Sequence, residues 1–157
     1  WHSACVVRRP PLMSGGLVFT WGSGFQGQLG QGKTTMSAKP KLVAYFRSMH
    51  ILIKEVVCGS HHNAVITSDG KLYTWGSNIN GCLGRFVEEN GTFSSEPGHC
   101  FGFGNIVDRI GRGLPRSVCC GKGYTIVATY PYSEPNAEKE SSKSLSMKLQ
   151  IDSLDGV

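Results

Sequence analysis

A short sequence stretch occurs twice in this chain, and the duplication limits the folds that the chain can adopt. VFTWGSGFQGQLG occupies residues 18–30, and LYTWGSNINGCLG occupies residues 72–84. When Trp21 is aligned with Trp75, three glycines of each copy also coincide. They are Gly22, Gly27 and Gly30 in the first copy and Gly76, Gly81 and Gly84 in the second. The chain is therefore a repeat protein.

A second duplicated segment extends the repeat. VVCGSHHNAVIT at residues 56–67 reappears as VCCGKGYTIVAT at residues 118–129, and HSACVV at residues 2–7 matches the end of the same segment. The aligned positions are Cys58 with Cys120, Gly59 with Gly121, and His62 with Tyr124. The offsets of about 54 to 62 residues fall in the range in which self-similarity indicates a propeller or a solenoid.

Residue patterning within each repeat predicts β-strands separated by turns. Runs rich in β-branched and aromatic residues are bounded by glycine, proline and Asp-Gly sequences. The predicted strands are 2–7, 17–21, 40–43, 53–57, 62–67, 72–75 and 124–129, and the repeat equivalent of 53–57 is predicted next to the segment 108–116. Residues 44–52 and 85–115 are predicted as loops. We expect a folded region over residues 1–130 and a polar linker or tail over residues 131–157.

Composition narrows the class of protein further. The content of 39% hydrophobic residues and 21 glycines suits strands and turns, and no apolar run is long enough for a membrane span. The six cysteines contain no CxxC pair, and two of them share one repeat position. We therefore expect buried free thiols, not a disulfide or zinc set, and a reducing cytoplasmic or nuclear location. The chain starts without methionine inside a repeat, so we expect it to be a piece of a longer protein.

Two nucleotide-binding patterns overlap the first copy of the repeat. Residues 22–27 match GxGxxG, and residues 27–34 match GxxxxGK[ST]. A phosphate site of either kind requires a helix directly afterwards, but the sequence instead reaches Pro40 without a helical apolar period. The second copy keeps the glycines and loses the lysine. We interpret the glycines as turn residues and expect no nucleotide cofactor.

The repeat closely resembles that of the regulator of chromosome condensation family. The resemblance rests on a CGxxH-x-A strand and a DGxhYTWGxNxxGxLG segment with a period near 60 residues. The residues that carry it are Cys58, Gly59, His62, Ala64, Asp69, Gly70, Lys71, Tyr73, Trp75, Gly76, Asn78, Gly81, Leu83 and Gly84. It implies an all-β fold, a seven-bladed β-propeller with four-stranded blades.

The chain departs from the family pattern in several places. Tyr124 replaces a usual histidine, Cys82 a common glutamine, and the loop over 85–115 is long. The length provides about two blades, one full repeat between two partial ones. Since no TWG segment follows residue 129, we expect the C-terminal part of a propeller.

The repeated residues favour a structural role over catalysis. Trp21 and Trp75 are expected to pack between blades, and His62 to act as a hydrogen-bonded structural residue. Tyrosine occupies the equivalent position at Tyr124 and cannot replace a general base at neutral pH. We therefore predict no catalytic residues, no metal site and no cofactor.

Loop arginines are the candidate partner-binding residues. Arg109, Arg112 and Arg116 lie in one segment, and Arg8 and Arg9 lie in another. Residues 1–130 carry a net charge of +7 and residues 131–157 a net charge of −2. A basic surface favours acidic partners, although a solvated surface without a partner is the simpler interpretation of these arginines. Nucleic acid is disfavoured because aromatic residues are not interleaved with the basic ones.

Three functions remain open. The preferred one is a non-catalytic protein–protein interaction propeller within a larger signalling or regulatory protein, which binds an acidic protein surface. The resemblance also allows guanine nucleotide exchange on a small GTPase, although no inserted wedge is recognisable, or association with chromatin.

Overall fold

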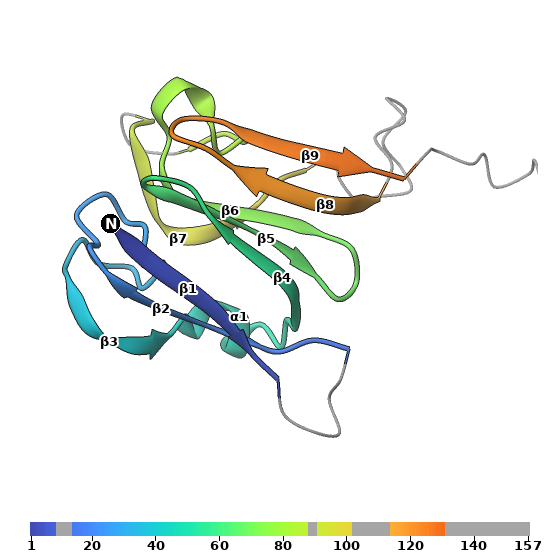
Figure 1. Ribbon diagram of the computed structural model, residues 1–157, viewed down its shortest axis with the longest axis horizontal. Coiled ribbons are helices and arrows are strands. Elements are labelled where there is room, and N and C mark those ends of the chain that lie inside the picture. The colour runs from blue at the N-terminus through green and yellow to red at the C-terminus, as the bar shows by residue number, and fades with distance from the viewer. Residues whose placement is uncertain (9–13, 88–90, 102–113, 131–157) are drawn as a thin grey trace, which may run out of the picture.

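The computed structural model describes residues 1–8, 14–87, 91–101 and 114–130, and the regular secondary structure of this part of the chain is mainly β-strand (Figure 1). Its nine strands form three antiparallel sheets. The first sheet contains β1 (His2–Val7), β2 (Leu17–Gly22) and β3 (Ser37–Leu42). The second contains β4 (Ile53–Cys58), β5 (His62–Thr67), β6 (Leu72–Ser77) and β7 (Phe93–His99). The third contains β8 (Pro115–Cys120) and β9 (Thr125–Thr129).

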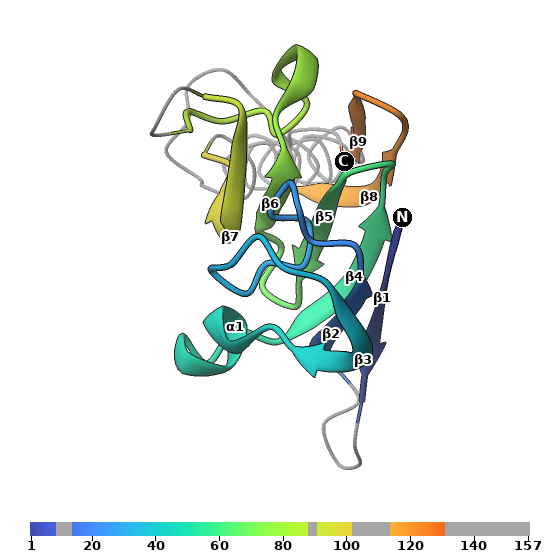
Figure 2. The same ribbon diagram turned by 90° about the vertical axis from the view of Figure 1, so that its left-hand side faces the viewer.

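The three sheets are successive copies of one unit. Strands pair in sequence order within each sheet, and the sheets stack face to face (Figures 1 and 2). The repeat makes β1 and β9 equivalent to β5, and β8 equivalent to β4. The second sheet is thus a complete four-stranded blade between two partial ones, as the sequence predicted. Equivalent backbone conformations accompany this: Gly22 and Gly76 have φ of +102° and +103°.

Strand alternation explains why two hydrophobic cores flank the second sheet. Every residue of β5 and β6 is buried, because both faces of these strands are covered. On β6, Tyr73 and Trp75 contribute to the core against the first sheet, whereas Leu72 contributes to the core against the third. Edge-to-face contacts of Phe46 with Tyr73 and Trp75, at centroid distances of 5.6 and 5.8 Å, fill the first core.

Three elements differ from the sequence prediction. The helix α1 (Ala44–Ser48) lies within the expected loop 44–52, and its five residues are too few to show a helical apolar period. Strand β7 lies within the expected loop 85–115, where the sequence FSSEPGH lacks β-branched and most apolar residues. Strand β3 begins at Ser37, earlier than predicted. The predicted tail 131–157 lies outside the described residues.

The cysteines also correct one expectation. All six are free, and Cys82 and Cys100 are buried as expected, but Cys58 and Cys119 are exposed. Cys119 follows the buried Val118 on β8, so alternation places it on the face that the second sheet does not cover. Burial raises the pKa of the neighbouring Cys120 to about 11.

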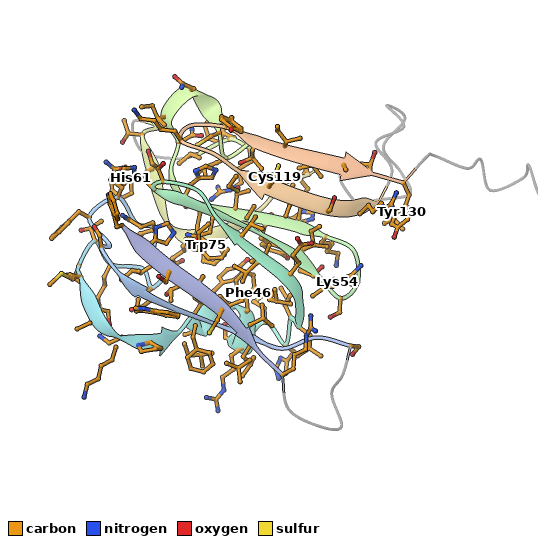
Figure 3. All side chains as sticks on the ribbon, in the orientation of Figure 1. Phe46, Lys54, His61, Trp75, Cys119 and Tyr130 are labelled. Carbon is orange, nitrogen blue, oxygen red and sulfur yellow. The ribbon has the colours of Figure 1, made fainter. Side chains whose placement is uncertain are left out.

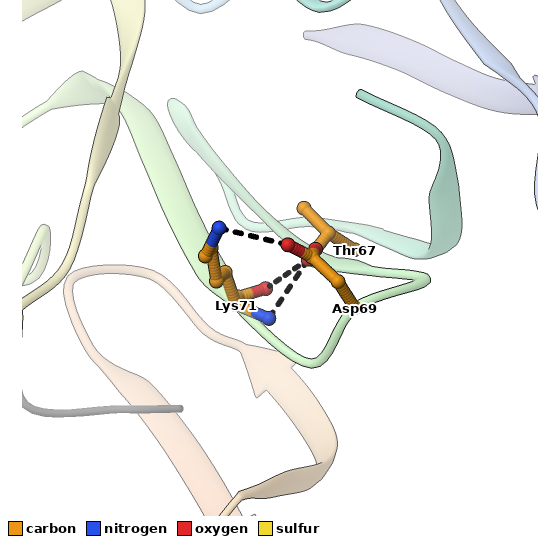
Figure 4. A network of polar contacts seen from close by, with 3 residues as sticks. All are labelled: Thr67, Asp69 and Lys71. Carbon is orange, nitrogen blue, oxygen red and sulfur yellow. Dashed lines mark hydrogen bonds and ion pairs between the residues drawn. The ribbon is translucent and has the colours of Figure 1, made fainter. Parts of the chain in front are cut away.

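The hairpin between β5 and β6 is held by its own side chains (Figure 4). Thr67 Oγ1 donates to the Asp69 carboxylate and accepts from the Lys71 backbone N–H at 2.8 Å, and Lys71 Nζ lies 2.8 Å from Asp69 Oδ2. Burial acts against the charged form of Asp69, but the hydrogen bonds from Lys71 and Thr67 outweigh it and lower its pKa. The Asp-Gly turn is therefore a closed polar unit on the outside of the blade.

Candidate functional site

A polar relay joins the first sheet to the second. His2 Nε2 donates to Asn63 Oδ1 at 2.8 Å, and Asn63 Nδ2 donates to the carbonyl oxygen of Gln28 at 2.7 Å. The Asn63 side chain, which is completely buried, thus bridges two segments of the first sheet's repeat. A buried amide that lacked these partners would cost free energy, so the pairing fixes the distance between the two blades.

The same relay occurs between the second and third sheets. Thr125 Oγ1 donates to the carbonyl oxygen of Cys82 at 2.8 Å and lies 2.9 Å from His62 Nε2. Because the hydroxyl hydrogen is directed at Cys82, His62 Nε2 is the donor to Thr125. Residues at equivalent repeat positions therefore perform equivalent contacts at both interfaces. Burial is the largest effect on both histidines and lowers the pKa of His2 and of His62.

The two repeat tryptophans lie in different surroundings. Trp75 is completely buried, and its Nε1 donates to the carbonyl oxygen of Gln28 at 3.0 Å. Figure 3 shows its ring between the first and second sheets, on the same side as Phe46. Trp21 is half-buried, since it points to the face of β2 that lies away from the second sheet. In the described chain, the expected packing between blades is therefore complete for Trp75 and partial for Trp21.

Sequence reasoning did not single out Asn63 or Thr125. The sequence did contain a signal for them: the residue directly after His62 and after Tyr124 is polar, within an otherwise apolar strand. Arg85 was also missed. Partial burial of its guanidinium lowers its pKa, and it donates to the carbonyl oxygen of Thr74 at 3.1 Å.

The described segments were searched for metal-binding clusters and for membrane-spanning helices. Within residues 1–8, 14–87, 91–101 and 114–130, no three His, Cys, Asp or Glu side chains are placed to hold a metal ion. In the same segments, no helix has the length and apolar character needed to cross a bilayer.

Basic residues gather at one end of the sheets, where β4 and β8 begin. An Arg8 guanidinium nitrogen donates to the carbonyl oxygen of Lys54 at 2.6 Å. Arg116 occupies the repeat position of Lys54, and its guanidinium lies 5.8 Å from the centre of the Tyr130 ring. Lys54 and Tyr130 lie toward the same side of the molecule in Figure 3. We call Arg8, Lys54 and Arg116 the basic end.

The other predicted partner-binding arginines are Arg9, Arg109 and Arg112, which lie outside the described residues. Arg9 directly follows Arg8 in the sequence, and the segment with Arg109 and Arg112 leads into β8.

Face-to-face antiparallel sheets built from one repeated unit define this chain as part of a β-propeller. Sequence models of the regulator of chromosome condensation (RCC1) repeat match residues 15–66 and 53–82. Residues 15–82 therefore match the RCC1 repeat.

Curated relatives share about half of the chain. The human E3 ubiquitin-protein ligase HERC2 is 37% identical over 93 residues, which cover 53% of this chain and 2% of HERC2. The zebrafish (Danio rerio) E3 ubiquitin-protein ligase MYCBP2 is 36% identical over 86 residues, which cover 55% of this chain and 2% of MYCBP2. The chain thus corresponds to a small part of these relatives.

Solved structures extend the similarity over most of the chain. Human WBSCR16 superimposes with a TM-score of 0.59 at 27% identity, covering 83% of this chain and 30% of WBSCR16. Prp20p from Saccharomyces cerevisiae, described with its binding properties to Gsp1p and histones, superimposes with a TM-score of 0.63. At 17% identity, over 92% of this chain and 32% of Prp20p, the latter similarity concerns the fold alone.

Proposed function

We propose that this chain is part of a propeller that serves as a non-catalytic protein–protein interaction module in a larger regulatory protein. The proposal rests on the observation that the repeated polar side chains make contacts between neighbouring sheets. His2 and His62, the residues with the greatest catalytic potential in the repeat, are buried or half-buried and donate to Asn63 and Thr125 of the neighbouring sheets. They hold blades together, which leaves recognition to the ends of the sheets.

The basic end is the surface that we assign to partner recognition. Arg8 is anchored by the Lys54 carbonyl oxygen, and Arg116 is within cation–π distance of Tyr130, so two of its cations are held in place. Positive side chains ordered on one edge attract acidic protein surfaces and accelerate their association. The partner that fits this surface is a protein with an acidic patch.

A photo-crosslinking amino acid placed at position 116 of the whole protein in cells tests this assignment. We expect position 116 to capture an acidic protein that position 39 does not capture, because Lys39 is an exposed cation on the outer strand β3. Arg8→Glu should abolish the capture, whereas Lys41→Glu on β3 should leave it unchanged. Equal capture from both positions, or no response to Arg8→Glu, would refute the assignment.

A second candidate function is guanine nucleotide exchange on a small GTPase. The fold similarity to Prp20p, whose description names Gsp1p, favours this candidate. Release of labelled GDP from a panel of small GTPases separates the two functions. Binding without faster release supports an interaction module, and faster release supports exchange. Chromatin association would instead show binding to nucleosomes that weakens steeply with salt.

We also infer that residues 131–157 form a polar linker after the propeller part and that the protein resides in the cytoplasm or nucleus. The sequence of 131–157 is rich in Ser, Glu and Lys, a composition that does not support a packed core. The free thiols Cys58 and Cys119 are compatible with a reducing compartment. Imaging of a fluorescent fusion of the whole protein tests the location, and protease mapping of the chain tests the linker.

A further inference from the structure

The basic end carries positive charge that the described residues leave without a carboxylate partner. All of its three cations are exposed, and none of them forms an ion pair within the described part of the chain. The turn between β5 and β6 reaches the same end, because the Ser68 N–H donates to the carbonyl oxygen of Leu52, directly before β4. The carboxylate of that turn, Asp69, is already paired with Lys71 Nζ at 2.8 Å. A counter-charge for the basic end therefore has to come from outside the described residues.

The described chain also reaches its last residue at the basic end. The backbone N–H of Tyr130 donates to the carbonyl oxygen of Leu114 at 2.9 Å, which fixes the end of β9 beside the start of β8. The Arg116 guanidinium lies 5.8 Å from the centre of the Tyr130 ring. The chain after Tyr130 thus starts beside the three cations.

Negative charge is concentrated in the sequence directly after Tyr130. Residues 131–140 contain three glutamates and one lysine, a net charge of −2, whereas residues 141–157 contain two lysines and two aspartates, a net charge of zero. The glutamates are Glu134, Glu138 and Glu140. We call residues 134–140 the acidic stretch. One chain therefore carries a basic end and an acidic stretch of opposite charge next to each other.

The acidic stretch is long enough to reach either end of the third sheet. An extended chain spans at most about 3.3–3.6 Å per residue, so Glu138, eight residues after Tyr130, can lie up to about 28 Å from it. The exposed Lys122 lies in the turn at the opposite end of β9, about 17 Å away along the five residues of this strand. The tether alone thus permits contact with Lys54 and with Lys122. A preference for Lys54 has to come from the other cations of the basic end.

We propose that the acidic stretch binds the basic end of the same chain and occupies the surface on which an acidic partner would dock. Its carboxylates pair with the two guanidinium groups and with the lysine amine. Each exposed ion pair contributes at most about a fivefold preference, but the tether makes the contact intramolecular and so raises the effective concentration of the carboxylates. The acidic stretch is therefore a built-in competitor. The contact is independent of the proposed function, whereas the competition rests on it.

Carbodiimide cross-linking of the whole protein tests the contact, because this reagent joins a lysine amine directly to a carboxylate that touches it. Peptide mapping by mass spectrometry should find the acidic stretch joined to Lys54 about fivefold more often than to Lys122, since arginines accompany only Lys54. Added salt should lower this ratio, because exposed charges are screened. Equal joining to the two lysines, or a ratio that salt does not change, would overturn the proposal.

A matched pair of substitutions identifies the cations involved. Arg116→Gln removes the guanidinium beside Tyr130 and should lower joining to Lys54 at least about twofold. Lys41→Gln, on the exposed outer strand β3, should leave it unchanged. Both positions are exposed, so neither substitution disturbs a core. An equal response to the two substitutions would also overturn the proposal.

The competition is tested in the capture experiment at position 116. Replacement of the three glutamates of the acidic stretch by glutamine should raise the capture of an acidic protein at least about twofold. Unchanged capture by a protein whose acidic stretch is joined to Lys54 would overturn the competition. Absence of any captured acidic protein would instead refute the partner assignment, and the ratio of Lys54 to Lys122 joining still decides the contact.

Discussion

Replacement of Asn63 by alanine tests the relay that joins the blades. The substitution removes both the acceptor for His2 and the donor to Gln28, at a side chain with no exposed surface. The Gln28 carbonyl oxygen still accepts from Trp75, so it stays partly satisfied. His2 Nε2 instead loses its described partner while its Nδ1 is already buried without one. The damage is therefore concentrated on His2.

The expected loss of unfolding free energy follows from these contacts. Two hydrogen bonds contribute about 1 kcal/mol each, and a half-buried donor left without a partner adds about 1 kcal/mol, the lower end of the desolvation penalty. We therefore expect Asn63→Ala to lower the free energy of unfolding by about 3 kcal/mol. This is a large fraction of the roughly 5–15 kcal/mol that stabilises a typical domain.

Asn63→Thr is the matched control, because Thr125 makes both relay contacts at the second interface. We expect this variant to retain most of the stability that Asn63→Ala loses. Equilibrium urea unfolding of the chain, followed by tryptophan fluorescence, measures both, since Trp75 lies at the affected interface. A loss below about 1 kcal/mol for Asn63→Ala, the size of a single hydrogen bond, would refute the relay argument.

Three further predictions concern titration, sterics and thiol access. The pKa of His62 is lowered in the folded protein, so the unfolded chain binds more protons. Stability should therefore fall as the pH drops below about 6.5. His62→Gln should reduce this fall, measured as the urea midpoint at each pH. Gly30→Ala should lower the urea midpoint more than Gly84→Ala, because both glycines have positive φ but only the first faces an indole; equal shifts would contradict this. Mass-spectrometric mapping should show Cys119 alkylated in the folded chain and Cys100 protected until urea unfolds it, and equal rates would argue against the described burial.

The blades could be predicted from the sequence because the repeated residues include glycines at positions whose backbone conformation favours glycine. Gly22 and Gly76 have the same positive φ at the end of equivalent strands, and this constraint is visible as an aligned glycine. The strands β5 and β6 were predicted in place because β-branched and aromatic residues fill them and the Asp-Gly turn joins them. Local sequence and fold agree at these positions.

Prediction failed where the local sequence carries little information. Strand β7 contains Pro97 and Gly98, and its place is set by pairing with β6, which the sequence of β7 does not reveal. Trp21 and Trp75 have identical neighbours in the sequence, yet only Trp75 is fully buried, because the first sheet covers its face. Contacts between repeats decide such differences, and the sequence of a single repeat does not reveal them.

The hydrogen bonds to the Gln28 carbonyl oxygen also impose an order on folding during synthesis. Its two donors, Asn63 and Trp75, follow it by 35 and 47 residues in the chain. At synthesis rates of about 5–20 residues per second, Gln28 leaves the ribosome several seconds before Trp75. During synthesis, the Gln28 carbonyl oxygen therefore stays without these two donors until the next repeat has been made. A chaperone can bind the first repeat during this delay.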